Sequence, residues 1–167
     1  GQVELRNLQG SVTVRYDERG VPHIRAENET DLYRALGYVH AQDRLFQMEA
    51  MRRLARGELA EVLGPKLLDT DKLFRSLRIR ERAASYVASL DKQSPAWKGL
   101  QAYLDGINQY QDTHAAPVEF DVLGIPKRPF TAEDTISIAG YMAYSFAAAF
   151  RTEPLLTYVR DQLGADY

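Results

Sequence analysis

The stretch from Gly37 to Gly64, GYVHAQDRLFQMEAMRRLARGELAEVLG, constrains the fold of this chain more than any other part of it. In this stretch and just before it, apolar side chains recur every three or four residues, at Leu32, Leu36, Val39, Phe46, Ala50 and Leu54. That period is typical of a helix that lays one face on a core. We therefore predict a long amphipathic helix that Asn28 or Thr30 caps. The helix should stop at Gly57, and Gly64 should close the turn that follows.

The basic residues of this helix are expected on the face opposite the apolar one. They are Arg34, Arg44, Arg52, Arg53 and Arg56. Glu49 stands four residues before Arg53, an order that favours a helical ion pair worth about 0.2–0.5 kcal/mol on a solvated surface. The pattern thus predicts an arginine-rich face directed to solvent.

Asp43 does not fit this simple division, because it lies between Val39 and Phe46, on or beside the apolar face. A buried carboxylate must be paired or hydrogen-bonded. One interpretation is that Asp43 and His40, one turn away, form a metal-binding or acid–base pair. The other is that Asp43 is a buried polar tether that fixes how the helix docks. We favour the tether, because metal sites normally need a third ligand and the sequence places none nearby.

Residues 11–26 predict a β-hairpin, because apolar and polar side chains alternate on both sides of a turn at Gly20. Pro22 cannot donate a ladder hydrogen bond, so its strand is an edge or begins late. His23 is either a catalytic base or a strand histidine bonded to a neighbour. We favour the second, because the sequence places no serine or cysteine partner beside it.

The rest of the chain predicts further helices and one apolar crossing. Helices are expected from about Thr70 to Leu90, from Ser94-Pro95 to about Gln111, from the cap at Thr131 to about Phe150, and from Glu153-Pro154 to Gly164. Residues 113–130 contain three prolines but also many apolar side chains, and so predict a structured connection. The fold class that follows is mainly α with a short N-terminal β-hairpin.

The helix that begins after Thr131 is apolar nearly all round, with no charge from Thr135 to Phe150. Such a helix is buried on every side or lines a pocket. Met142 and Phe146 are four residues apart and share a face; on spacing alone, a core position explains them best. Ser145 is expected to bond a backbone carbonyl one turn earlier rather than to act as a nucleophile.

Composition excludes several classes of function. The chain has 167 residues, enough for one domain, and a net charge of −2 that gives no electrostatic basis for binding nucleic acid or an anionic membrane. It has no cysteines, which excludes disulfides and thiolate chemistry. No apolar run approaches the ~20 residues of a membrane span. The first residues lack a signal-peptide pattern, so an exported form would already be trimmed.

No complete catalytic set can be assembled from the sequence. There is no nucleophile-elbow motif, zinc-protease motif or phosphate-binding glycine loop. The three histidines, His23, His40 and His114, are scattered. The excess of apolar helix surface over polar surface predicts a large permanent partner.

Three stretches, in this order, resemble the small (α) subunit of the penicillin acylase family of N-terminal nucleophile hydrolases. They are the run GVPHI at residues 20–24, the stretch from Gly37 to Gly64 with its specific core AQDRLFQME, and the apolar helix with Met142 and Phe146. The resemblance implies a precursor that is exported to the periplasm and cuts itself into α and β chains, which together build one αββα sandwich. Residues 1–167 would then be a single α-subunit segment completed by a separate β chain, and not an independent domain.

The resemblance also implies the chemistry. The nucleophile, usually serine, is the first residue of the β chain, so no catalytic residue is expected in this chain. Attack on the amide of a penicillin or an N-acyl-homoserine lactone would give an acyl-enzyme, which water then hydrolyses. No organic cofactor is implied. Partners are the β subunit and a small N-acyl amide substrate.

Site residues follow from the same resemblance. Met142 and Phe146 match α-chain positions of the acyl pocket. Ser145 stands where penicillin G members often have an arginine, and three alanines follow Phe146, which favours a long aliphatic acyl chain. Glu153 is the candidate α-chain ligand of one structural calcium shared with the β chain, although it could instead only cap the next helix.

Two other hypotheses stay open on the sequence. The first is a non-catalytic, stand-alone helical binding module with an apolar groove around Met142 and Phe146. The second is a metal-dependent hydrolase that uses His40 and Asp43.

Overall fold

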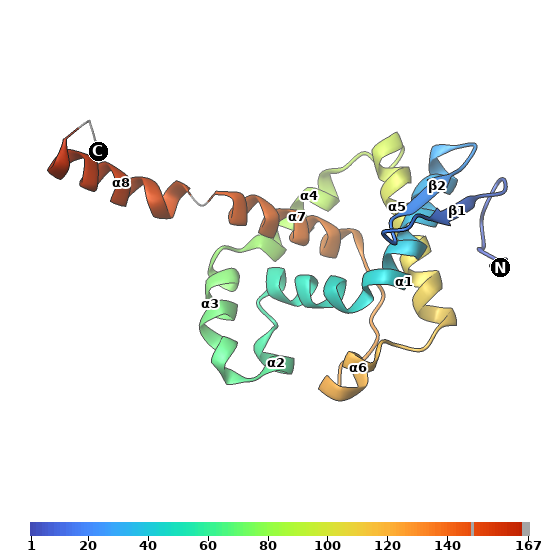
Figure 1. Ribbon diagram of the computed structural model, residues 1–167, viewed down its shortest axis with the longest axis horizontal. Coiled ribbons are helices and arrows are strands. Elements are labelled where there is room, and N and C mark those ends of the chain that lie inside the picture. The colour runs from blue at the N-terminus through green and yellow to red at the C-terminus, as the bar shows by residue number, and fades with distance from the viewer. Residues whose placement is uncertain (148, 165–167) are drawn as a thin grey trace.

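A computed structural model describes residues 1–147 and 149–164. In these residues the chain is mainly helical with one antiparallel two-stranded hairpin, as predicted (Figure 1). The elements are β1 Thr13–Tyr16, β2 Pro22–Arg25, α1 Glu29–Arg56, α2 Ala60–Leu63, a 3₁₀ turn Pro65–Leu67, α3 Leu68–Ser76, α4 Ile79–Ser89, α5 Pro95–Thr113, α6 Val118–Leu123, α7 Ala132–Phe146 and α8 Ala149–Leu163.

Helices α1 and α5 form the centre of the fold by an unusually close crossing. A Cβ built on Gly37 of α1 would lie 1.9 Å from the carbonyl oxygen of Tyr103, and one built on Gly106 of α5 would lie 1.9 Å from that of Arg34. The two glycines therefore let the helix backbones touch. Around this crossing the core is filled by side chains from α1, α5, α6, the segment between α6 and α7, and the first residue of α7: Ala41, Leu45, Met48, Leu104, Ile107, Phe120, Ile125, Phe130 and Ala132.

Several local predictions are confirmed. Asn28 caps α1 by accepting a hydrogen bond from the Asp31 backbone, and Gly57 ends it in a left-handed conformation. Ser94 caps α5. Pro22 is the first residue of β2, where no ladder hydrogen bond from its nitrogen is needed.

The prediction of which face of α1 is buried is only partly right: Val39 is buried and Arg44 is exposed as predicted, but other positions are reversed. Leu36, expected in the core, is 40% exposed, whereas Arg34, Arg52 and Arg53, expected in solvent, are buried. The buried face instead contains acidic residues that pair with these arginines, so charge does not force it outward. Asp43, expected to be buried, is exposed.

The helix boundaries differ from prediction at three places. The helix expected from Thr70 to Leu90 is two helices, because Arg78 adopts a left-handed conformation with φ 54° between α3 and α4. Helix α7 ends at Phe146 rather than near Phe150, and α8 runs from Ala149 with Pro154 inside it. Finally, α1 is not one regular helix, since Arg44 has non-helical dihedral angles.

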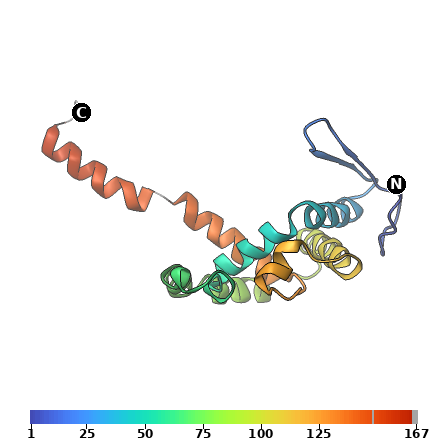
Figure 2. The ribbon, with the colours of Figure 1, turned by 60° about the horizontal axis from the view of Figure 1, so that its bottom comes forward.

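Two parts of the chain project from the helical body. The β-hairpin stands off the N-terminal end of α1, and α8 extends away at the opposite end (Figures 1 and 2). Large apolar side chains of α8 are exposed: Leu155, Leu156, Tyr158 and Leu163. Part of the apolar helix surface that predicted a permanent partner therefore lies on this arm.

The close crossing predicts a strong effect of one added methyl group. Gly106→Ala should lower the free energy of unfolding by about 3 kcal/mol, because the new Cβ meets backbone rather than a movable side chain. Gly99→Ala is the matched control on the same helix, since its Cβ would meet only the partly exposed ring of Tyr33, at 3.0 Å. Denaturation of the full-length protein and the two variants measures the difference. Equal stability of both variants would contradict the close crossing.

Candidate functional site

Helix α7 has one packed face and one open face. On the packed face, Phe74 of α3 meets Tyr141 with ring centroids 5.5 Å apart and Tyr144 at 5.6 Å. Gly140 lies against α4, where a Cβ would approach Ile79 to 2.9 Å. Aromatic pairs at these distances are worth about 0.5–1.5 kcal/mol beyond the area they bury. The second half of α7 is thereby held against α3 and α4.

The open face contains the predicted acyl-pocket residues. Met142 is 48% exposed and Phe146 is 81% exposed, and both continue a strip of exposed alanines at 139 and 143. Of the two alternatives for this helix, burial on every side does not hold within this chain, and lining a pocket stays a prediction. The Ser145 hydroxyl donates to the Met142 carbonyl at 2.8 Å, as predicted. Serine brings no charge to this position of the open face.

Glu153 lies on α8, beyond the end of α7. Its side chain is exposed and borders a shallow pocket with Ala149, Pro154 and Thr157. The alternative that Glu153 caps a new helix is wrong, because α8 already runs from Ala149. Calcium takes six to eight oxygen ligands. Within residues 1–147 and 149–164 no group of three or more histidine, cysteine or acidic side chains could hold a metal ion. Glu153 fits a calcium site only as one ligand among several from elsewhere.

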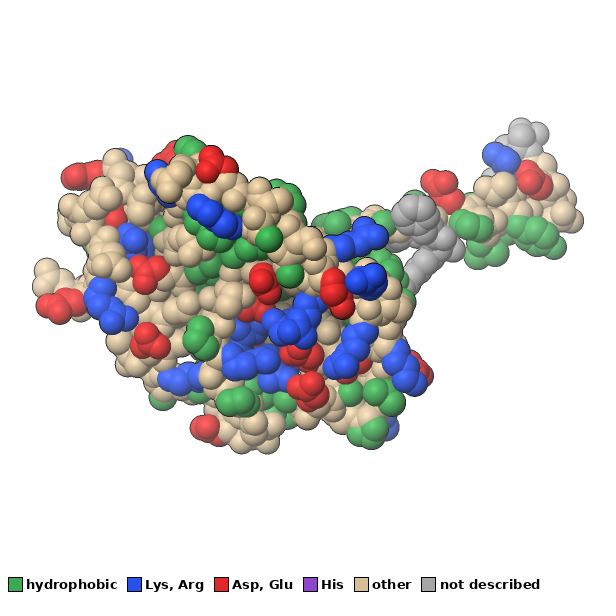
Figure 3. Space-filling model, turned by 180° about the vertical axis from the view of Figure 1, so that it is seen from behind, with side chains coloured by type: hydrophobic (Ala, Val, Ile, Leu, Met, Phe, Trp, Pro, Cys, Tyr) green, Lys and Arg blue, Asp and Glu red, His purple; other side chains and the backbone are tan. Residues whose placement is uncertain are grey.

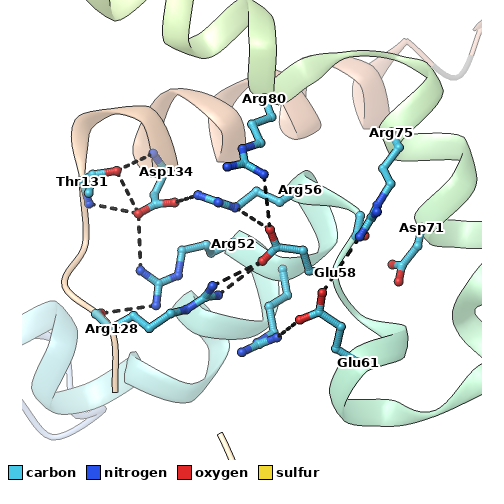
Figure 4. A network of polar contacts seen from close by, with 12 residues as sticks. Arg52, Arg56, Glu58, Glu61, Asp71, Arg75, Arg80, Arg128, Thr131 and Asp134 are labelled. Carbon is cyan, nitrogen blue, oxygen red and sulfur yellow. Dashed lines mark hydrogen bonds and ion pairs between the residues drawn. The ribbon is translucent and has the colours of Figure 1, made fainter. Parts of the chain in front are cut away.

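The start of α7 is fixed to α1 by a buried carboxylate, that of Asp134 (Figure 4). Arg56 donates to Asp134 Oδ1 at 2.8 Å, and Arg52 donates to Asp134 Oδ2 at 3.3 Å. Asp134 also closes a capping box with the predicted cap, Thr131, in which it accepts from the Thr131 backbone at 3.0 Å. Burial by itself would raise the pKa of Asp134, but Arg52 and the hydrogen bonds from Thr131 and Arg56 outweigh it and lower the pKa.

The two arginines that hold Asp134 are themselves fixed. Arg52 binds Glu49 through two of its nitrogens and donates to the Pro129 carbonyl at 3.0 Å. Arg56 donates to Glu58 at 2.9 Å. Burial would raise the pKa of Glu58, but Arg56 and Arg128 lower it. Seen from the other side of the molecule, acidic and basic side chains intermingle on the helical body (Figure 3).

The sequence predicted only a cap at Thr131 and a solvent-facing position for the arginines of α1. One signal in the sequence could have indicated buried ion pairs. Glu49 and Glu58 lie within two helical turns of three arginines, Arg52, Arg53 and Arg56. Nothing in the sequence indicated that Asp134, from a distant helix, would join them.

His40 and Asp43 do not form the pair that a metal-dependent hydrolase would need. His40 Nδ1 lies 2.7 Å from the Tyr103 hydroxyl, and burial, followed by the charge of Arg44, lowers the His40 pKa. Asp43 accepts from the Tyr16 hydroxyl at 3.1 Å, so it tethers β1 to α1 at the surface rather than in the core. His23 lies 3.1 Å from Asp17 within the hairpin, which fits the strand-histidine interpretation.

Comparison with known proteins gives consistent results. The sequence profile of the penicillin amidase family matches residues 11–167. The chain is 38% identical to penicillin acylase 2 proenzyme of Pseudomonas sp. strain SE83 over 83% of its own length and 18% of that protein. It is 32% identical to acyl-homoserine lactone acylase QuiP of Pseudomonas putida over 99% of its length and 20% of that protein. The chain thus spans about a fifth of these curated relatives.

A solved structure gives the same result at the level of the fold. Thermostable penicillin G acylase from Alcaligenes faecalis matches with a TM-score of 0.71 and 30% identity, covering 93% of this chain and 86% of that one. Among the described residues, no helix is long and apolar enough to cross a membrane. By profile, sequence and fold, the chain belongs to the penicillin amidase family.

Proposed function

We propose that this chain is the small subunit of a heterodimeric N-acyl amide hydrolase, completed by a β chain from the same precursor. The observation that carries the proposal is the family match over residues 11–167 of a chain that spans only about a fifth of its relatives. One relative is named a proenzyme. The exposed apolar faces of α7 and α8 support a large permanent partner, which would complete an αββα sandwich.

In this proposal the chemistry belongs to the β chain. The hydroxyl of its N-terminal serine attacks the amide carbonyl while its own α-amino group takes the proton. The C–N bond breaks, the protonated amine leaves, and an acyl ester remains on the serine. Water then attacks the ester and releases the acid, and the serine hydroxyl is restored. Residues of this chain take no part in bond making; they bind the acyl group.

The open face of α7 would form a wall of the acyl pocket. Met142 and Phe146 present a thioether and a ring that an acyl chain can bury, and Ser145 adds no charge beside them. This lining suits aliphatic as well as phenylacetyl groups. Substrates would be penicillins, N-acyl-homoserine lactones or both, as the names of two relatives suggest, and the enzyme would work in the periplasm.

The subunit composition tests this proposal directly. The full-length gene product, purified and denatured, should give two polypeptides by mass spectrometry. N-terminal sequencing should show that the larger one begins with serine, threonine or cysteine. A single folded polypeptide with the mass of this chain would contradict the proposal. It would favour instead the non-catalytic binding module with an apolar groove around Met142 and Phe146.

Removing the Phe146 ring should change acyl preference. Burying such a side chain is worth about 1.5–3 kcal/mol, so Phe146→Ala should shift the ratio of kcat/KM for a phenylacetyl amide against a decanoyl amide by about tenfold. Tyr86→Ala, which truncates an exposed ring on α4, is the control and should leave the ratio unchanged. Steady-state kinetics of the processed enzyme give the ratio. An unaltered ranking in Phe146→Ala would remove this residue from the acyl pocket.

We also propose that Glu153 supplies one ligand to a calcium ion shared with the β chain. Its exposed carboxylate is available, and a cation there would need further oxygen ligands from the partner.

Calcium removal should then destabilise the enzyme through Glu153. Chelation should lower the melting temperature of the wild-type heterodimer by several degrees, because a bound ion stabilises only the folded state. Glu153→Gln should melt lower from the start and lose the response to chelator. Asp161→Asn, which neutralises another exposed carboxylate on α8, should keep the response. A full response in Glu153→Gln would exclude this residue as a ligand; scanning calorimetry measures all three proteins.

A further inference from the structure

We infer that Asp134 is a positioning residue, which fixes the orientation of α7 on α1 and thereby sets the acyl-chain preference of the enzyme. The inference rests on the proposed function for its second part. It concerns no group that touches substrate, because Asp134 is 2% exposed and lies at the base of the helix, two to three turns before Met142 and Phe146.

The clamp on Asp134 is rigid at both ends. Its two carboxylate oxygens are held separately, Oδ1 by Arg56 and Oδ2 by Arg52. Arg52 is in turn fixed by Glu49, which is fully buried, and by the carbonyls of Pro129 and Arg128 in the loop that leads to α7. A guanidinium is planar and its donors point in fixed directions. The carboxylate therefore has one position in which both arginines are satisfied.

Because α7 is a continuous helix, the position of Asp134 at its base determines where Met142 and Phe146 lie. With a rise of 1.5 Å per residue, Met142 lies about 12 Å along the axis from Asp134, and Phe146 about 18 Å. A tilt of about 10° at the base would move Phe146 by about 3 Å, which is enough to lengthen or shorten an acyl pocket by two methylene groups. Met142 and Phe146 are exposed, so neither is locked by packing within this chain.

A second attachment limits which way α7 can move. Phe74 contacts Tyr141 and Tyr144, and Gly140 lies close to Ile79, so apolar and ring contacts hold the packed face on α3 and α4. Apolar contacts are not directional and tolerate small shifts. The charged clamp at the base supplies the direction that they lack.

The test uses Asp134→Asn in the full-length, processed enzyme. Asparagine keeps the shape and can still cap the helix, but it loses the charge that both arginines require. The control is Asp31→Asn. Asp31 is likewise a buried carboxylate at a helix start, held by Asn28 and by Arg34 at 3.4 Å, but it lies at the far end of α1 from α7. Both variants should melt at a lower temperature than the wild type, so a loss of stability by itself should affect both of them.

Two readouts separate positioning from mere stability. The first is the kcat/KM ratio for phenylacetyl against decanoyl amides, which Asp134→Asn should shift at least threefold and Asp31→Asn should leave within experimental error. The second is hydrogen exchange of the α7 amides, which should become faster in Asp134→Asn alone. Arg56→Lys, which keeps a charge but cannot hold Asp134 and Glu58 together, should move both readouts in the same direction by less. If Asp134→Asn does not fold, the same two measurements on Arg56→Lys test the inference.

The outcomes are distinct. An unchanged ratio in Asp134→Asn, or an equal shift in Asp31→Asn, would overturn the inference. If the wild type hydrolyses neither amide, the proposed function fails, and the exchange measurement then decides by itself whether Asp134 positions α7. Unchanged α7 exchange in both Asp134→Asn and Arg56→Lys would overturn that part as well.

Discussion

The structure depends on one buried carboxylate, that of Glu49, which has no exposed surface and binds Arg52 and Arg53 of its own helix. Removing one partner of such a pair costs about 3–5 kcal/mol, because the other charge is left buried. With Glu49 in place, α1 can turn an arginine-rich face inward. That face then holds the loop before α7 and the first turn of α7. The position of the apolar helix is thus a consequence of charge pairing inside α1.

The elements that the sequence predicted are those that local chemistry decides. Gly57 ends α1, Ser94 caps α5 and Pro22 opens β2 because each acts on its own few residues. The buried face of α1 could not be predicted in the same way. Hydrophobic periodicity assigns every arginine to solvent, and only a count of nearby acidic partners corrects it. The break at Arg78 also had no signal, because left-handed backbone at an arginine has no sequence signature.

The candidate site shows the same division. The capping box at Thr131 and the back-bond of Ser145 were local and were predicted, whereas the role of Asp134 needed a partner from α1. Spacing alone favoured a core position for Met142 and Phe146, and only the resemblance to a family pointed to a pocket. In the part of the chain that the structure describes, both side chains are open to solvent.

The projecting helix α8 has a consequence for how such a protein is synthesised. Its exposed leucines would make a freely diffusing small subunit prone to self-association. In the precursor that we propose, both parts would be on one chain, so the partner surface would be present at an effective concentration of about millimolar and docking would be intramolecular. The apolar surface of α8 would then dock on its partner surface faster than it would meet a second copy of the protein. Cleavage after docking would remove the covalent connection but leave the apolar surface of α8 buried. The order of synthesis, docking and cleavage would therefore protect α8 from self-association.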